Sequence, residues 1–173
     1  GSGNVLHDLI LSERLPVVCL SQVFRQAMES KIISNAHKIV NGESPDLSNN
    51  GKDFFHMERP NPYTSAQTVA SLCSERLPNA YDWDPFADIQ VICPSKKGET
   101  GTQNLNRLLQ SALNPPDKTK GEIIVAGQTF RTGDKIMQIK NNYNIEWESK
   151  DEKGKGIFNG DIGFITEIHK ESK

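Results

Sequence analysis

Apolar runs of strand length alternate with amphipathic helical patterns in the first two thirds of this chain. The runs Leu15–Leu20 and Ile89–Cys93 are continuous and carry β-branched residues, which is typical of strands buried on both faces. Helical patterns are predicted over Val5–Leu11, Ser30–Gly42, Pro62–Leu77 and Thr100–Asn114. Strands that alternate with helices favour a parallel sheet covered by helices, which is a doubly wound α/β fold.

Local signals define the ends of these helices. Ser30 is a good N-cap, Gly42 a good stop, and Pro78 is expected to close the helix that opens at Pro62. In the helix after Ser30 one apolar stripe is expected to face the core, formed by Ile32, Ile33, Ala36 and Ile39. A weaker strand is predicted at Phe54–Met57.

The pattern changes after residue 120, because no helical period follows Glu122. Short strands are predicted at Glu122–Ala126, Lys135–Ile139 and Gly163–Ile168, with turns at Gly133-Asp134 and Asn159-Gly160-Asp161. The charged, glycine-containing stretch Asn144–Gly156 is expected to be a mobile tip. The sequence therefore predicts two domains, a partial α/β domain over residues 1–120 and the start of a small antiparallel β module over residues 121–173.

Composition excludes some classes of protein and leaves others open. No apolar run approaches the roughly 20 residues that span a bilayer, and no signal peptide is visible. The three cysteines have no paired spacing, and the four histidines have no metal-ligand spacing, so a reducing, cytoplasmic setting without a metal is expected. The net charge is −2, but the stretch Ser95–Lys140 has eight basic and four acidic residues, which permits a local phosphate-binding face.

Arg25 and Gln26 follow the first apolar run at the point where a parallel strand would end. A guanidinium is always charged, and its planar fork fits phosphate oxygens. Arg25, with Gln26 beside it, is therefore a candidate catalytic residue for phosphoryl chemistry, and both are taken as the catalytic candidates. The alternative is a surface arginine that pairs with Glu29 one turn later.

The segment Pro94–Thr102 is a second candidate site, because it joins a predicted strand to a predicted helix. Backbone N–H groups at a helix start attract phosphate, and the adjacent lysines add charge. The spacing is not that of a phosphate-binding Walker A loop, so contact with a nucleic-acid backbone is expected rather than a nucleotide cradle. The candidate DNA-binding residues here are Ser95, Lys96, Lys97, Thr100, Thr102 and, on the following helix, Asn106. An ordinary basic loop is the alternative.

Asn142 and Tyr143 are further DNA-binding candidates in the β module. Tyr143 has a ring that can stack on a base. Alternatively, the asparagines serve turns and the tyrosine packs across a hairpin.

Four strings, in order, resemble RecD-like superfamily 1 DNA helicases, the exodeoxyribonuclease V alpha subunit family. They are Leu20–Ala27 with Ser30–Gly42, Val91–Asn114, Gly133–Tyr143 and Phe158–Gly163. The resemblance implies the second RecA-like motor domain, interrupted by a Src-homology-3-like β insertion. It also implies an ATP- and Mg²⁺-dependent motor that moves 5′ to 3′ on single-stranded DNA in recombination or repair. Recombination nuclease subunits are possible partners, and Arg25 would reach the γ-phosphate of ATP.

The chain also departs from that family pattern. It has no Walker A lysine, no Asp-Glu Walker B pair, and none of the helicase motifs that normally follow the β insertion. We therefore expect these residues alone to bind no cofactor, hydrolyse no ATP and unwind no DNA. A non-catalytic binding module and the helicase part of a conjugative relaxase are the alternative functions.

Overall fold

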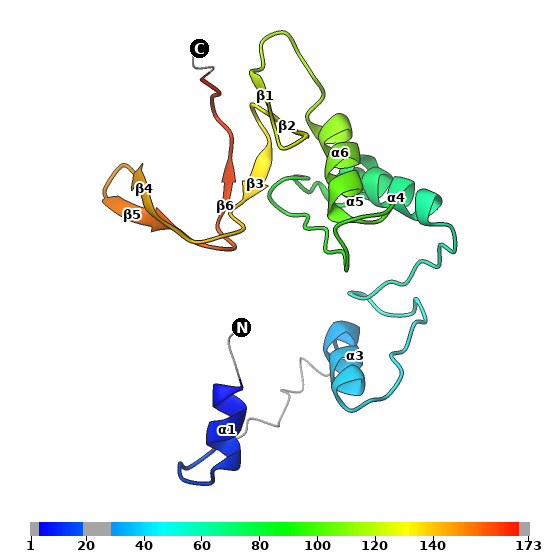
Figure 1. Cartoon of the computed structure of the whole chain (residues 1–173). Coiled ribbons are helices and arrows are strands. Elements are labelled where there is room, and N and C mark those ends of the chain that lie inside the picture. The colour runs from blue at the N-terminus through cyan, green and yellow to red at the C-terminus, as the bar shows by residue number, and fades with distance from the viewer. Residues whose placement is uncertain (1–3, 19–28, 170–173) are drawn as a thin grey trace. The chain divides into compact units, whose positions relative to one another are not determined.

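The computed structural model describes residues 4–18 and 29–169 of the chain. It divides into two compact units, Gly1–Glu58 and Arg59–Lys173, and its elements are labelled in Figure 1. Among the helices of the described ranges, none has the length and apolar character that crossing a membrane requires.

The first unit contains the helices α1 (Val5–Leu11) and α3 (Lys31–Val40). Both are present where the sequence predicts them. Ser30 caps α3 as expected, since its Oγ accepts a hydrogen bond from the backbone N–H of Ile33 at 3.3 Å. Gly42 adopts a φ of +78° just after the helix, a conformation that glycine reaches without a steric penalty.

The expected apolar stripe of α3 does not face a core in this unit. Ile32 and Ile39 are 53% and 60% exposed, whereas Lys31 and Asn35 on the neighbouring face of the helix are buried. The segment that follows the helix folds back over this polar face and hydrogen-bonds to it. The expectation is therefore wrong for the burial of α3, because side-chain hydrogen bonds decide which face is covered.

The second unit begins with a continuous helical segment composed of α4 (Pro62–Ser71), the π-helical turn η1 (Leu72–Arg76) and α5 (Leu77–Tyr81). Pro78 was expected to end this helix but lies inside it. A proline lacks the N–H that an α-helix needs and crowds the preceding turn. The wider turn η1 lies directly before it, where the Leu77 N–H donates to the Leu72 carbonyl five residues back, and so accommodates the proline.

The helix α6 (Thr102–Leu113) confirms the prediction for Thr100–Asn114 and packs against α4 and η1. Its Leu105 is 3% exposed and joins Ala66 and Cys73 in the small apolar core of this unit. Burial raises the pKa of the Cys73 thiol. This core holds the start of α6 in place.

The predicted parallel sheet is absent from the described residues. Their only strand ladders are antiparallel, and neither residues 15–18, Phe54–Met57 nor Ile89–Cys93 form a strand. Val18 and Ile92 are 87% and 91% exposed. A strand is stabilised by the hydrogen bonds and side-chain pairs of its neighbours. These apolar runs find no such neighbour, so they remain without regular structure.

The C-terminal part of the second unit is antiparallel, as the sequence predicts. The strand β1 (Glu122–Val125) pairs with β2 (Gln128–Arg131), and β3 (Lys135–Met137) pairs with β6 (Ile162–Phe164). Ala126 and Gly127 join β1 to β2 with φ values of 50° and 78°, which is the signature of a tight type I′ turn.

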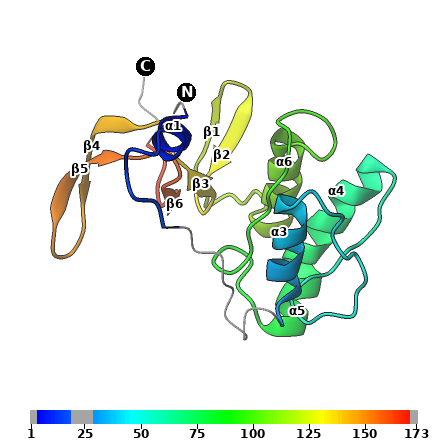
Figure 2. The same cartoon turned by 90° about the horizontal axis from the view of Figure 1, so that it is seen from below.

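The stretch Asn144–Gly156, expected to be a mobile tip, lies within a hairpin of β4 (Asn142–Glu148) and β5 (Lys153–Ile157). Figures 1 and 2 show it extending away from the β3–β6 pair. Cross-strand ion pairs join Glu146 to Lys155 at 3.0 Å and Glu148 to Lys153 at 2.9 Å. The charged residues that suggested a loop therefore pair across a strand ladder.

Candidate nucleic-acid interface

Arg25 and Gln26, the predicted catalytic residues, lie outside the described residues. Their roles stay predictions from sequence. The other candidates lie in the second unit.

The segment Pro94–Gly101 forms a closed loop at the start of α6. Two loop carbonyls accept hydrogen bonds from the helix start: Ser95 from the Thr102 N–H at 3.0 Å, and Lys96 from the Gln103 N–H at 3.2 Å. Both N–H groups are therefore already used within the loop and are not free to bind a phosphate.

A glycine fixes the shape of this loop. A Cβ at Gly101 would lie 2.5 Å from the Lys97 carbonyl oxygen and 2.8 Å from the Lys96 carbonyl carbon, so only glycine fits. Asn104 ties the loop to the helix from the other side by donating to the Glu99 carbonyl at 2.8 Å. The loop conformation is thus specified by its own residues.

The loop presents adjacent lysines to solvent. Lys96 and Lys97 are exposed, as are Ser95 and Thr102, while Thr100 is half-buried. The Ser95 hydroxyl donates to the Lys97 carbonyl at 3.0 Å and so helps to hold this backbone. We call the exposed residues Ser95–Lys97 the lysine loop. Its chemistry is that of two cations on a fixed backbone, which suits a polyanion.

Asn106 is exposed on α6 and points away from the core that its neighbour Leu105 enters, as expected. Arg107 beside it donates to the Asn104 side-chain oxygen at 2.9 Å. Asn106 is therefore accessible to a ligand that passes over this helix, while Arg107 and Asn104 support each other.

Asn142 and Tyr143 lie on the β4–β5 hairpin, apart in sequence from the lysine loop. The Asn142 side chain accepts from the Asn144 N–H at 3.1 Å, which is a local turn-like bond. The ring of Tyr143 meets Phe158 edge to face at a centroid distance of 5.8 Å, yet the residue remains 65% exposed. Packing across the hairpin and an accessible aromatic face thus coexist.

A buried polar network at the end of α6 escaped the sequence reasoning. Asn114 donates to the Asp134 carboxylate at 2.8 Å and to the Thr132 carbonyl at 3.1 Å, and Gln110 reaches the same carboxylate at 2.6 Å. Arg131 donates to the Asn114 carbonyl and pairs with Glu122 at 2.5 Å. The one sequence feature that pointed to this network was the predicted turn at Gly133-Asp134. Nothing in the sequence places that turn beside α6.

Comparison with known proteins identifies this region. Residues 105–173 match the family model of the SH3 domain of ATP-dependent RecD-like DNA helicases. Over 157 residues, 91% of this chain, the sequence is 33% identical to the ATP-dependent RecD2 DNA helicase of Deinococcus radiodurans. These two matches support a fragment of a RecD-like helicase. The chain is also 35% identical, over 104 residues and 54% of its length, to an uncharacterized protein of Methanocaldococcus jannaschii.

This RecD-like segment spans only 19% of the Deinococcus protein and 9% of the Methanocaldococcus protein. The matched SH3 region begins inside α6 and includes the strands β1 to β6. The family match agrees with the antiparallel β module predicted from sequence. It also assigns Asn114 and its partners Arg131 and Asp134 to one and the same region.

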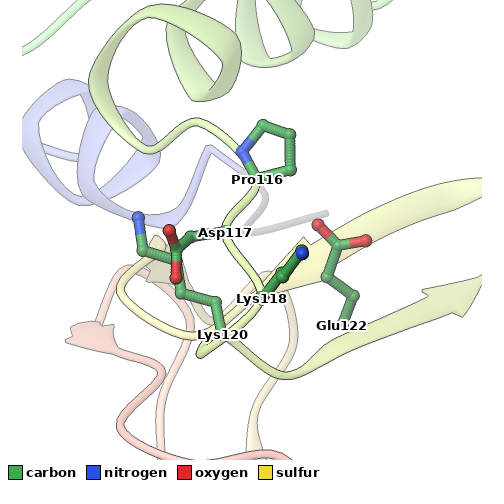
Figure 3. A pocket seen from close by; sticks show the side chains of 5 residues that line it. All are labelled: Pro116, Asp117, Lys118, Lys120 and Glu122. Atoms are coloured by element: carbon green, nitrogen blue, oxygen red, sulfur yellow. The ribbon is translucent and has the colours of Figure 1, made fainter.

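An open pocket of about 390 Å³ lies on the connector between α6 and β1 in the RecD-like segment (Figure 3). It is lined by Pro116, Asp117, Lys118, Lys120 and Glu122. Hydrogen bonds from Thr119, led by its hydroxyl, lower the pKa of the Asp117 carboxyl. The pocket contains none of the predicted DNA-binding residues, and its mixed charges do not favour an anion. Within the described ranges no cluster of three or more His, Cys, Asp or Glu side chains is placed to hold a metal ion.

Proposed function

We propose that this chain is part of an ATP-dependent DNA helicase and supplies a stretch of the surface along which a single DNA strand passes. The observation that carries the proposal is the 33% identity to a RecD2 DNA helicase over 91% of the chain. The exposed lysine loop on its fixed backbone supports it.

The lysine loop would act through charge. Lysines that neutralise phosphates release condensed counterions, so each contact contributes to affinity and to its salt dependence. Because Gly101 fixes the backbone, little conformational entropy is lost when the strand binds. Asn106 extends the same surface along α6, and Tyr143 with Asn142 would offer a base-stacking contact on the hairpin.

Arg25, with Gln26 beside it, would complete the ATPase site in the full-length protein. An arginine that reaches the γ-phosphate stabilises the charge of the transferring phosphoryl group. ATP and Mg²⁺ would be held by another part of the protein, since this sequence has no Walker A lysine. We propose 5′ to 3′ movement in recombination or repair for that protein, and no ATPase activity for this chain alone.

The lysine loop is tested by substituting Lys96→Ala and Lys97→Ala together in the full-length parent. Fluorescence anisotropy measures the binding of a labelled oligothymidine at salt concentrations between about 50 and about 300 mM. Over this range the salt dependence of binding is large enough to give a slope. Single-strand contacts contribute about 0.7 each to the slope of log K against log salt, so the loss of two lowers the slope by about 1.4.

The matched control is Lys118→Ala with Lys150→Ala, which removes the same charge from exposed lysines elsewhere. The control should leave the salt slope within experimental error of wild type. Equal slopes for the wild-type protein and the Lys96/Lys97 variant would remove the lysine loop from the DNA path.

A further inference from the structure

The Lys31 side chain ends in a cage of oxygen atoms. Its residue is 8% exposed, although it lies on the first turn of α3. The Nζ donates to the Ser48 carbonyl oxygen, to the Ser48 hydroxyl at 2.8 Å and to the Asn50 side-chain oxygen at 2.8 Å. It also lies 3.1 Å from the Asp46 carboxylate. Four oxygens thus surround one positive charge.

The segment Asp46–Asp53, which we call the cation loop, is held around this ammonium. Asn35 and Asp46 form a reciprocal pair, with the Asn35 amide donating to the Asp46 carbonyl at 3.0 Å and accepting from its N–H at 2.8 Å. At the other end the Asp53 carboxylate accepts from the Lys31 N–H at 3.0 Å and from the Ser30 hydroxyl. Gly51 lies against the Lys31 stem, where a Cβ would approach Cδ to 3.0 Å.

The sequence of the cation loop matches part of a calcium-binding pattern. Asp46-Leu47-Ser48-Asn49-Asn50-Gly51 has oxygen-bearing side chains at positions one, three and five, and glycine at six. An EF-hand loop begins in the same way and uses those three side chains as Ca²⁺ ligands. Here the same three positions supply the oxygens that contact Lys31 Nζ. The twelfth position is Met57 in place of the usual glutamate.

We propose that the cation loop is a cation-binding site whose cation is the Lys31 ammonium, and that it takes Ca²⁺ when that ammonium is removed. The ligands are hard oxygens, which suit Ca²⁺. In the native chain the positive charge of Lys31 fills the site and repels a metal ion. Asp46 is the one carboxylate among the contacting side chains, so the site created in this way is weak.

The test replaces Lys31 in the 173-residue chain. In Lys31→Ala the thermal midpoint should rise as CaCl₂ is added, with a dissociation constant on the order of 1 mM, as weak calcium sites show. The comparison is NaCl at equal ionic strength. The wild-type midpoint should not respond to Ca²⁺, and Lys31→Ala combined with Asp46→Asn should lose the response. A Lys31→Ala chain that responds no more than wild type would overturn the proposal.

The acetylation rate of Lys31 in the wild-type chain tests the proposal if Lys31→Ala does not fold. Lys31 should react with an acetylating reagent at least roughly tenfold more slowly than the exposed Lys52, because the cation loop must open first. Asn50→Ala should reduce this protection. Equal acetylation rates for Lys31 and Lys52, followed by mass spectrometry of the peptides, would show that the ammonium is not held in the loop.

Discussion

Gly101 offers a quantitative check on the lysine loop, because the substitution Gly101→Ala adds a single methyl group where backbone atoms already lie. The new Cβ would be 2.5 Å from the Lys97 carbonyl oxygen, 2.7 Å from the Lys97 carbonyl carbon and 2.8 Å from the Lys96 carbonyl carbon. Backbone atoms cannot rotate away as a side-chain end can. The φ and ψ of Gly101 are −82° and 160°, which alanine adopts freely, so the effect is steric only.

Relief of this clash requires the Lys96–Lys97 backbone to move away from α6. That movement breaks two hydrogen bonds, from the Thr102 N–H to Ser95 at 3.0 Å and from the Gln103 N–H to Lys96 at 3.2 Å. Each such bond contributes about 0.5–1.5 kcal/mol, so the free energy of unfolding should fall by about 1–3 kcal/mol. Because water can reach these groups once they separate, we expect the free energy of unfolding to fall by about 2 kcal/mol, the middle of this range.

Urea unfolding of the 173-residue chain measures the total effect, and amide hydrogen exchange locates it. Exchange should accelerate at Thr102 and Gln103 and remain slow in the middle of α6, whose bonds are not involved. Gly163→Ala is the matched control, since a Cβ there meets no atom within 4 Å. A Gly101→Ala chain as stable as Gly163→Ala, with unchanged exchange at Thr102, would refute the account of the loop.

Three further substitutions probe other parts of the structure. Asn114→Ala removes an amide that serves the Asp134 carboxylate and the Thr132 carbonyl, so unfolding should become easier by about 1–3 kcal/mol in urea, whereas Ser111→Ala on the same helix should change little. The Ser30 hydroxyl, followed by backbone N–H groups, lowers the pKa of Asp53 below its ordinary 3.8. The resulting stabilisation is present above about pH 4 and is lost as the pH falls through the lowered pKa. Circular dichroism should therefore show the helicity of α3 falling as the pH is lowered. In Asp53→Asn this fall should be smaller, because the variant already has lower helicity at neutral pH. Gly154→Ala places a methyl group against the Trp147 indole, so the ring should swing outward and the tryptophan emission shift to the red. An unshifted spectrum would mean that the indole does not lie over Gly154.

Helices and turns were predictable from sequence because their signals are local. Ser30 caps α3 through its own side chain, and the apolar spacing of α6 places Leu105 in the core. The turn at Asn159-Gly160 likewise has the expected positive φ at its glycine. In each case a few neighbouring residues contain the whole physical reason for the structure.

Sequence alone could not show that residues 15–18 and 89–93 form no strand, or that β4 and β5 form a hairpin, because strand pairing depends on partners distant in sequence. Ile89–Cys93 has the composition of a buried strand, but composition does not supply a neighbouring strand. In the hairpin, Gly154 suggested flexibility, yet the Trp147 ring fills the space above it. The predicted tip is thus a ladder stabilised by an aromatic side chain on a glycine.

The position of the lysine loop was predictable from the sequence, but its backbone hydrogen bonds were not. The sequence placed Lys96 and Lys97 at the start of a helix, which is where the structure has them. It also suggested free N–H groups there, while the loop uses those at Thr102 and Gln103 for itself. Hydrogen bonds between a loop and a helix depend on the exact path of the backbone, which residue types alone do not determine.

The helix α6 connects the lysine loop to the SH3 region. Its first turn holds the loop through two backbone hydrogen bonds, and its last turns hold the β2–β3 turn through Gln110 and Asn114. Twelve helical residues separate these attachments by about 18 Å at most, at 1.5 Å per residue. Because a helix resists bending over such a length, a displacement of the β module must carry the lysine loop with it. If the lysine loop contacts a DNA strand as proposed, this coupling would let the β module set the position of Lys96 and Lys97 on that strand.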